Sequence, residues 1–329
     1  MQKTNIIGAD LSKKTIDLYC QTTNAYLAIA NDLSGFKLMV KWLKQQHVQL
    51  NDVIIVMEHT GLYSNRLEDF LQANGIAFAK INALEIKQSI GVVRGKSDKI
   101  DAKRIAQYGS QKVGKLLLSK PIDEDLKRLK MLMSSKNLLV RQRAALRCSI
   151  KEYRNIELSD NDLIIKSQLT IIAALDKQIQ KIEDAMQALI NGSLSLNNNY
   201  QLLLSIPGVG PVVAITAIIK THNFSRFNDA RKFACFSGTA PFPHQSGSSL
   251  RKKTRISHLA DKQMKTLLDL AAKSAIQCDP EMKAYYQRRV EAGKSKRSTI
   301  NVVRNKIIGR MFAVIKRQTP FLKDYLVAA

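Results

Sequence analysis

The order of strand and helix signals in the first third of the chain limits its possible folds more than any other feature. Five segments have the apolar or alternating patterns of short strands, and three have apolar residues at helical spacing. The expected strands cover residues 5–10, 15–22, 25–30, 53–57 and 76–81, and the expected helices cover about 36–43, 62–73 and 98–108. Ser34 is the expected N-cap of the first helix, and Asn74-Gly75 is the expected stop of the second.

Three strands followed by alternating helices and strands form the order of a ribonuclease-H-like α/β sandwich. In that arrangement the first and fourth strands are neighbours, and the later helix packs across them. We therefore expect residues 1–120 to form one domain with this fold.

Four carboxylates occupy positions where this fold would bring them together. Asp10 and Glu58 stand at the ends of the first and fourth strands, and Asp98 and Asp101 lie three residues apart at the start of a helix. Each alone has an ordinary structural explanation as a cap or an exposed strand end. Together they repel unless cations lie between them, and hard divalent ions prefer oxygen ligands. They are candidate ligands of Mg²⁺, with Mn²⁺ as an alternative, for phosphodiester chemistry.

From about residue 121 the pattern changes to long helices. Apolar residues recur at alternating threes and fours, as in a coiled coil, at Ile165, Ile172, Leu175, Ile179, Ile182, Met186 and Leu189, with Gln168 at one seam position. The preceding segment, with Leu126, Leu129 and Met133 on one face, is the expected antiparallel mate. The domains predicted are a coiled-coil hairpin over 121–195 and a mainly helical C-terminal domain over 196–329, with the Ser- and Asn-rich residues 191–199 as a linker.

A short glycine turn opens the C-terminal region. Residues 206–211 read Ile-Pro-Gly-Val-Gly-Pro and precede an apolar helix through Ile219, which is typical of a helix-hairpin-helix turn. Gly208 and Gly210 would let backbone N–H groups approach a phosphate. A turn of this kind is also common in proteins that bind no nucleic acid, so the assignment depends on the basic charge of the chain.

A serine-rich segment precedes a run of cations. Ser246, Ser248 and Ser249 are followed by a basic run that comprises Arg251, Lys252, Lys253 and Arg255. By composition this is a flexible loop with phosphate-binding cations, or a candidate nucleophile beside groups that stabilise charge at phosphorus. His244 and His258 are possible bases, although histidines near a loop are more often surface residues.

The charge of the chain points to a polyanionic partner. It has 52 Lys and Arg against 27 Asp and Glu, for a formal charge of +25. A basic region near the C-terminus includes Arg288, Arg289, Arg304, Lys306 and Arg310, just after Tyr285 and Tyr286. Nucleic acid is the expected partner. No apolar run of about 18 residues and no signal peptide occur, so we expect a cytoplasmic protein without a membrane span.

Taken together, these motifs resemble those of the DEDD transposases of bacterial insertion sequences, a group that includes the Piv-type DNA invertases. The matching elements are residues 7–10 (Ile-Gly-Ala-Asp), 58–61 (Glu-His-Thr-Gly), 96–102 (Lys-Ser-Asp-Lys-Ile-Asp-Ala), 206–210 and 246–249 (Ser-Gly-Ser-Ser). Their order and spacing agree over nearly the whole chain.

The resemblance implies a RuvC-like N-terminal domain, a coiled-coil middle and a C-terminal transposase domain. It also implies strand exchange through a covalent link between DNA and a serine, here Ser246, and guidance by a structured RNA encoded beside the gene. Donor and target DNA would be the substrates. Because recombining two duplexes needs four strand cuts, a homo-oligomer is expected, either a dimer or a tetramer.

Three other functions remain open at this stage. A hydrolytic nuclease or resolvase would use the same carboxylates with water in place of Ser246. A non-enzymatic DNA-binding protein would use only the glycine turn and the basic surface. An actin-like ATPase shares the sandwich but needs a second phosphate loop, which the sequence lacks.

Overall fold

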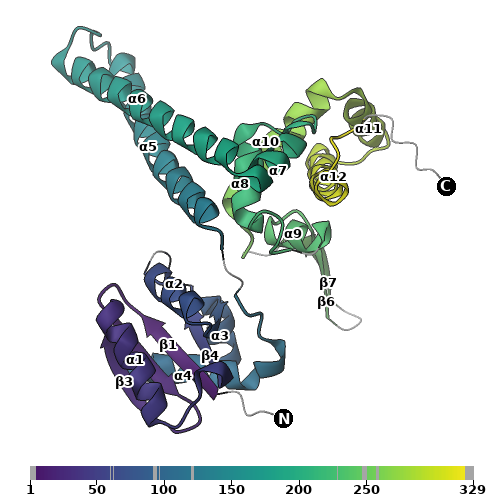
Figure 1. Cartoon of the computed structure of the whole chain (residues 1–329). Helices are drawn as coiled ribbons and strands as arrows, with labels where there is room; N and C mark the ends of the chain where they lie inside the picture. The colour runs from purple at the N-terminus through teal and green to yellow at the C-terminus, as the bar shows by residue number, and fades with distance from the viewer. Residues whose placement is uncertain are drawn as a thin grey trace. The chain divides into compact units, whose positions relative to one another are not determined.

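The fold is described from a computed structural model of the chain. It describes residues 5–59, 61, 63–91, 95, 97–119, 122–227, 229–246, 250–256 and 259–322, with the side chains of 90, 243–246 and 250–255 excepted. The chain divides into two compact units, residues 1–121 and 122–329 (Figure 1).

A mixed sheet of five strands forms the centre of the first unit. Its strands are β1 (Asn5–Leu11), β2 (Thr15–Cys20), β3 (Tyr26–Ala30), β4 (Val53–Glu58) and β5 (Ala77–Ile81). They lie in the order β3-β2-β1-β4-β5, with β1, β2 and β3 antiparallel and β4 and β5 parallel to β1. The predicted pairing of the first and fourth strands is confirmed, and the sheet is consistent with the expected ribonuclease-H-like arrangement.

Helices cover both faces of this sheet. Those of the first unit are α1 (Leu33–Gln45), α2 (Asn65–Ala73), α3 (Ala83–Ile90) and α4 (Asp98–Gln111), with short 3-10 turns at Leu50–Asp52 and Val113–Lys115. One core joins α1 and α2 to alternate strand residues such as Ile7 and Ile55, and a second joins α3 and α4 to Ile6 and Val56. The alternation of Ile6 with Ile7 therefore assigns each strand position to one face.

The structure differs from the local predictions for this unit at three places. The N-cap of α1 is Asp32, whose carboxylate accepts a hydrogen bond from the Gly35 N–H at 2.9 Å, and Ser34 lies inside the helix. Helix α3 was not predicted, because its eight residues carry too short an apolar pattern to be recognised. Leu62, the expected start of the second helix, is outside the described residues, and α2 begins at Asn65.

The second unit begins with the two longest helices. Helices α5 (Glu124–Asn155) and α6 (Leu163–Gly192) run antiparallel and pack along their length, as Figure 1 shows. The predicted seam is confirmed, since Ile165, Ile172 and Ile179 are buried. At the polar seam position, the Gln168 side-chain amide donates to the Ser149 hydroxyl at 3.1 Å.

The remaining helices pack into one core at the end of the α5–α6 hairpin (Figure 1). They are α7 (Leu194–Leu204), α8 (Pro211–Thr221), α9 (Ala230–Phe236), α10 (Lys262–Cys278), α11 (Pro280–Glu291) and α12 (Lys296–Arg317). Leu126 of α5 and Met186 of α6 belong to the same core. The predicted middle and C-terminal domains thus share one hydrophobic interior.

The predicted linker over residues 191–199 is wrong. Helix α6 continues to Gly192 and α7 begins at Leu194, with a single residue between them. Leu196 and Tyr200 are buried in the core of the unit, and this packing outweighs the weak helix propensity of serine and asparagine. In the described part of the chain, no helix is both long enough and apolar enough to span a membrane.

Candidate active site

Asp10 and Glu58 lie side by side at the ends of two parallel strands. The register pairs Ala9 of β1 with Met57 of β4, so Asp10 and Glu58 are the next positions along the two strands. In β1, Asp10 lies two residues after Gly8 and four residues after Ile6. The Ile6 side chain packs against α4. Because strand side chains alternate, Asp10 and Glu58 are on the face that α4 covers.

Helix α4 begins at this edge of the sheet. The Ser97 hydroxyl caps the helix by accepting a hydrogen bond from the Ile100 N–H at 3.3 Å, and Asp98 and Asp101 fall in the first turn. Serine is a favoured N-cap, and acidic residues in the first turn are stabilised by the helix dipole. Two carboxylates are thereby placed on the helix end that approaches the sheet.

Gly8 allows α4 to approach β1 closely. A Cβ atom built on Gly8 would lie 2.1 Å from the Ala102 carbonyl oxygen and 2.4 Å from the Ala106 amide nitrogen. No side chain fits in that space. The second residue of the Ile-Gly-Ala-Asp motif is thus required by packing, and the packing brings α4 to the strand that carries Asp10.

The acidic groups at this edge interact electrostatically. Burial, followed by the charges of Asp101, Asp98, Asp17 and Glu58, raises the pKa of Asp10 from its ordinary value of 3.8 to about 6. Burial, followed by the charge of Asp101, also raises the pKa of Glu58 above its ordinary value. Asp10 is therefore close enough to the other three predicted carboxylates for their charges to oppose its ionisation.

The ligand geometry is not preassembled around a single point. Asp101 accepts a hydrogen bond from Arg104 at 2.8 Å, and the same guanidinium donates to the Gly95 carbonyl oxygen at 3.0 Å. Across the described residues, no three His, Cys, Asp or Glu side chains are close enough to hold one ion. The oxygen donors and their mutual repulsion nonetheless fit a divalent cation, since such an ion would relieve the repulsion that raises the Asp10 pKa.

A fifth carboxylate, Asp17, was missed from the sequence. The antiparallel register of β1 and β2 pairs Asp17 directly with Asp10, and Asp17 is only 7% exposed. The Tyr26 hydroxyl donates a hydrogen bond to Asp17, which raises the pKa of Tyr26 to about 12. The signal that could have identified Asp17 was the short connection between the first two strands, which fixes their pairing once the turn is assigned.

Ser246 is the last residue of a strand in the second unit. Strands β6 (Phe242–Ser246) and β7 (Leu250–Arg255) form an antiparallel hairpin, in which Ser246 pairs with Leu250. The sequence predicted a loop here, and the structure places the serine at the end of an ordered ladder. Ser248, Ser249 and His258 are outside the described residues, and His244 lies within β6.

The four predicted cations near Ser246 all belong to β7. Arg251, Lys252 and Arg255 pair through the backbone with residues of β6, and Lys253 lies between them. The backbone of the hairpin therefore carries the serine and the basic run on paired strands. The two glycines predicted to meet phosphate lie in the turn between α7 and α8.

Those glycines differ in their surroundings. Gly208 has φ +87°, and a Cβ atom there would lie 2.5 Å from the Ala271 carbonyl oxygen of α10. Gly210 precedes α8 with φ −94°, and nothing lies within 4 Å of its added Cβ. The conformation and contacts of Gly208 explain its presence by packing alone, whereas Gly210 has open space in front of it.

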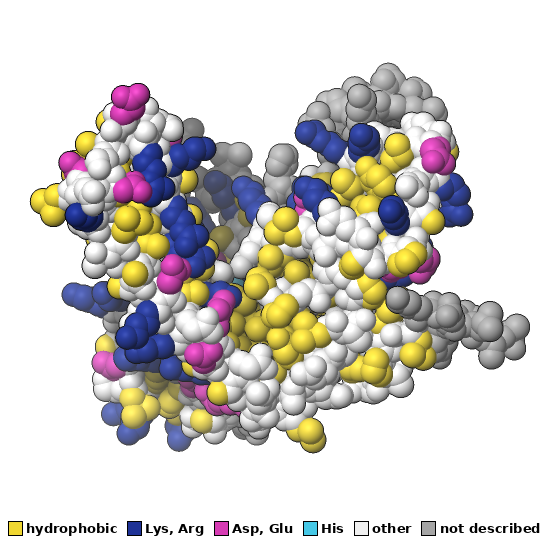
Figure 2. All heavy atoms as spheres, turned by 90° about the horizontal axis from the view of Figure 1, so that it is seen from above, with side chains coloured by type: hydrophobic (Ala, Val, Ile, Leu, Met, Phe, Trp, Pro, Cys, Tyr) yellow, Lys and Arg dark blue, Asp and Glu magenta, His cyan; other side chains and the backbone are white. Residues whose placement is uncertain are grey.

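The basic residues of α11 and α12 also have two kinds of surroundings. Arg310 forms ion pairs with Asp279 at 2.7 Å and with Glu281 at 2.6 Å, so its positive charge is balanced within the protein. By contrast, the Tyr285 ring has three cations around it: Lys306, Arg288 and Arg289 lie 4.4, 5.6 and 5.8 Å from its centroid. Figure 2 shows one face of the protein, over which Lys and Arg side chains are spread with fewer Asp and Glu between them.

Two family models match the chain, and their residues contain both halves of the candidate site. A DEDD transposase model covers residues 7–153, and a model described as the transposase IS116/IS110/IS902 family covers 200–287. The first range includes Asp10, Glu58, Asp98 and Asp101, and the second includes Ser246. The chain belongs to the DEDD transposase and recombinase family.

Relatives of this DEDD recombinase include proteins that match it over nearly their whole length. The pilin gene-inverting proteins of Moraxella bovis and Moraxella lacunata are each 29% identical to it over 335 aligned residues, which cover 98% of this chain and 99% of theirs. A 43.6 kDa protein of insertion element IS110 in Streptomyces coelicolor is 25% identical over 158 residues, or 48% of this chain and 38% of that protein. The DEDD recombinase is thus a DNA-rearranging enzyme of the type that insertion sequences encode.

Proposed function

We propose that this DEDD recombinase cuts and rejoins DNA by a metal-dependent reaction in which Ser246 forms a covalent bond to DNA. The observation that carries the proposal is the placement of Asp10 and Glu58 at adjacent strand ends, on the face of the sheet that α4 covers. Burial there, together with the charges of Asp101, Asp98, Asp17 and Glu58, raises the pKa of Asp10 to about 6. Carboxylates that repel at neutral pH are an unfavourable arrangement unless cations bind among them.

Asp10, Glu58, Asp98 and Asp101 would be the ligands of one or two Mg²⁺ ions. When bound there, such ions stabilise the oxygens that attack and leave phosphorus. Arg104 occupies only Oδ1 of Asp101, so Oδ2 would be the oxygen that Asp101 offers to an ion. The same guanidinium also donates to the Gly95 carbonyl oxygen, which would keep a positive charge beside the site for a phosphate of the DNA.

Ser246 would act as the nucleophile. Its Oγ attacks the scissile phosphorus, the hydroxyl proton is lost to a base, and the deoxyribose oxygen leaves with the electron pair of the broken P–O bond. The product is a phosphodiester between Ser246 and one DNA end. A deoxyribose hydroxyl of another strand can attack that phosphorus in turn, so strands are exchanged and the serine is regenerated.

The Arg and Lys residues of the hairpin would hold the DNA during this reaction. Arg251 and Lys252 of β7 directly follow Leu250, the residue paired with Ser246 in the ladder, and we assign them to the phosphates that flank the scissile one. With Lys253, Arg255 and the cations around Tyr285, they leave a large positive charge to be neutralised by nucleic acid. We expect affinity for DNA to fall steeply between 50 and about 200 mM salt, and a flat dependence would contradict this assignment.

A structured guide RNA and an oligomer complete the proposed function. Pairing between that RNA and both DNA partners would supply target choice, while the protein contacts backbone and shape. Specificity that is unchanged after RNase treatment would rule the RNA out. Four strand cuts for two duplexes favour a tetramer, which light scattering of the protein bound to DNA measures directly.

The deciding experiment compares wild type with Ser246→Ala and Ser248→Ala on labelled substrate DNA in the presence of Mg²⁺. A protein–DNA adduct that survives denaturation should form with wild type and Ser248→Ala and be absent from Ser246→Ala. An adduct in Ser246→Ala, or cleavage by that variant at the wild-type rate, would contradict the serine mechanism. The second outcome would favour a hydrolytic nuclease, which uses the same carboxylates with water.

A further inference from the structure

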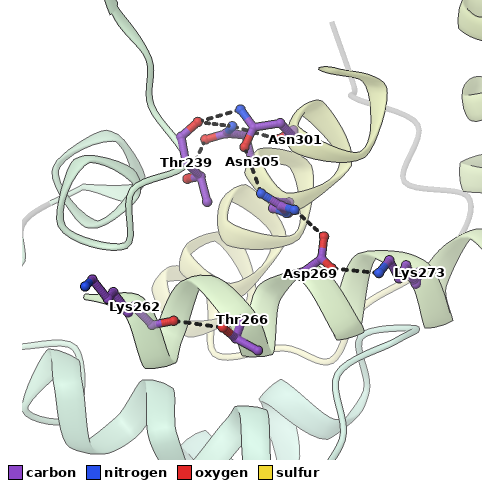
Figure 3. Close-up of polar contacts among 8 residues, drawn as sticks. Thr239, Lys262, Thr266, Asp269, Lys273, Asn301 and Asn305 are labelled. Atoms are coloured by element: carbon purple, nitrogen blue, oxygen red, sulfur yellow. Dashed lines mark hydrogen bonds and ion pairs between the residues drawn. The ribbon is translucent and has the colours of Figure 1, made fainter. Parts of the chain in front are cut away.

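The base of the β6–β7 hairpin is held by two asparagines of α12. The side-chain amides of Asn301 and Asn305 both donate to the Thr239 carbonyl oxygen, at 2.8 and 3.0 Å (Figure 3). The Thr239 hydroxyl donates back to Asn305 Oδ1 at 3.1 Å. Thr239 is fully buried and precedes β6, the strand that ends at Ser246. We call Thr239, Asn301 and Asn305 the hairpin clamp.

The clamp is itself fixed by further polar contacts. Asn305 Nδ2 also donates to the Asn301 carbonyl oxygen at 2.9 Å, and Asn301 Oδ1 accepts from Arg304 at 3.4 Å. Arg304 in turn forms an ion pair with Asp269 of α10. Burial alone would raise the pKa of Asp269, but hydrogen bonds from Lys273 and Arg304 outweigh it and hold that pKa below its ordinary value. The asparagines are therefore oriented by a charged network that joins α10 to α12.

The chain that follows β7 is held against the residues just before Thr239. The Asp261 N–H, after β7, donates to the Phe236 carbonyl oxygen at 2.8 Å. Gly238 has φ +66°, and a Cβ atom there would lie 2.5 Å from the Ala260 Cβ. Both ends of the hairpin thus meet the helical core, and the ladder shifts register between Phe242 and His244, directly beyond the clamp.

The two asparagines are not needed to hold α12 in the protein. The helix buries Val303, Ile307, Ile308, Met311 and Val314 in the main core, whereas Asn301 and Asn305 are only half-buried. Two amide donors on a single carbonyl oxygen restrain the direction in which the chain leaves Thr239. A small rotation at this point would move the far end of β6 by a larger distance.

We infer that Asn301 and Asn305 are positioning residues, which orient the hairpin so that Ser246 is presented to the scissile phosphate. This inference rests on the proposed function, since it assigns the asparagines a role in the serine step. Misplacement of a reacting group by about 1 Å can reduce a rate about 100-fold, so the loss of the clamp should slow the chemical step without removing the serine.

The test uses Asn301→Ala and Asn305→Ala, with the exposed Gln287→Ala of α11 as the matched control. At saturating DNA and Mg²⁺, adduct formation should slow by about 10- to 100-fold in both variants, while the dissociation constant for DNA stays within about 2-fold of wild type. Gln287→Ala should match wild type in both. Equal losses in rate and in affinity, or no loss of rate, would overturn the positioning role.

A second readout is independent of the serine chemistry. Trypsin cleaves after Arg251, Lys252, Lys253 and Arg255, so its rate within β7 reports how often the hairpin opens. Cleavage there should be about 10-fold faster in Asn301→Ala, with an unchanged melting temperature. If wild type forms no Ser246 adduct, the proposed function fails, but faster cleavage in β7 still establishes the clamp. Unchanged cleavage overturns the clamp whatever the chemistry.

Asn305→Asp covers the case in which the alanine variants do not fold. It keeps the size of the side chain and the acceptor for the Thr239 hydroxyl, but it places a carboxylate oxygen opposite the Thr239 carbonyl oxygen. Adduct formation should fall as in Asn305→Ala, and Asn305→Asp with a wild-type rate and wild-type trypsin cleavage would contradict the inference.

Discussion

Gly8 of β1 and Ala102 of α4 are in such close contact that a Cβ atom on Gly8 would lie 2.1 Å from the Ala102 carbonyl oxygen. The same two elements carry the proposed ligands, since Asp10 lies two residues after Gly8 and Asp101 lies one residue before Ala102. A second glycine, Gly109 of α4, lies against the sheet in the same way, 2.7 Å from Ile6 and Val56 methyl groups if a Cβ is added. The spacing between helix and sheet is therefore set by residues without side chains.

Replacing Gly8 with alanine should force α4 away from β1. We expect a loss of stability of about 1–3 kcal/mol, typical of overpacking, and a larger fractional loss of Mg²⁺-dependent cleavage, because Asp101 moves away from Asp10. Thermal unfolding and cleavage assays measure the two effects. Gly114→Ala is the control, since nothing lies within 4 Å of a Cβ at that glycine. Wild-type cleavage in Gly8→Ala would show that the separation of helix and strand is not critical.

Replacing Asp101 with asparagine should abolish cleavage and leave DNA affinity within a few-fold of wild type. One proposed ligand is lost, while the basic surface that binds phosphates is unchanged. Glu152→Gln, an exposed change on α5, controls for the altered net charge. Cleavage and filter-binding assays separate the effects, and a parallel loss of DNA binding would indicate that Asp101 supports the fold rather than the reaction.

Asp10 makes stability depend on pH in metal-free buffer. The folded protein retains the Asp10 proton up to about pH 6, whereas the ordinary value is 3.8. Between these values the folded state binds more protons than the unfolded state, so the stability contributed by Asp10 falls as pH rises through this window. Asp10→Asn carries no charge at any pH. It should therefore match wild type near pH 4 and exceed it above pH 6, by about 1–2 kcal/mol after allowance for solvent screening.

Melting curves at pH 4, 6 and 8 with chelator test this order of stabilities. Added Mg²⁺ should then raise the melting temperature of wild type at pH 8 and have little effect on Asp10→Asn, because the ion removes the repulsion that the substitution has already removed. Asp184→Asn on the exposed face of α6 provides a control outside the sheet. An Asp10→Asn protein that is less stable than wild type at pH 8 without metal would refute this account of the site.

Much of the first unit could be predicted because its signals are local. Apolar runs and alternating patterns indicated the five strands, and the order of strands and helices indicated the sandwich. That sandwich makes the first and fourth strands neighbours, and the expected convergence of Asp10, Glu58, Asp98 and Asp101 followed from it. Asp17 could not be placed in the same way, since its position opposite Asp10 depends on the register of β1 and β2 rather than on a pattern within either strand. Pairing registers are set by contacts between segments.

The second unit was harder to predict because tertiary packing outweighs local preference there. The Asn- and Ser-rich α7 is helical because Leu196, Tyr200 and Leu203 are buried in the common core. The β6–β7 hairpin combines a serine-rich sequence with the cation-rich Leu250–Arg255, which lacks the apolar alternation of a half-buried strand. The hairpin clamp joins Thr239 to residues more than sixty positions later, at a distance no sequence pattern spans.

The glycine turn offers a test that separates packing from DNA contact. Gly208→Ala introduces a Cβ at φ +87° and 2.5 Å from the Ala271 carbonyl oxygen, so strain and overlap act together. We expect a loss of about 2–4 kcal/mol and a clear fall in melting temperature. Gly210→Ala has room for its Cβ and an ordinary φ of −94°, so its melting temperature should stay at the wild-type value.

Because Gly210→Ala should fold normally, its DNA affinity reports on the turn itself. If the N–H groups at the start of α8 approach a phosphate, the added methyl group obstructs that approach, and affinity should fall by about 3- to 10-fold. Ser195→Ala on the exposed side of α7 is the control. Measured by fluorescence anisotropy at fixed salt, a wild-type affinity in Gly210→Ala would remove the turn from the DNA interface. The Pro-Gly-Val-Gly motif would then be explained by the packing of Gly208 against α10 alone.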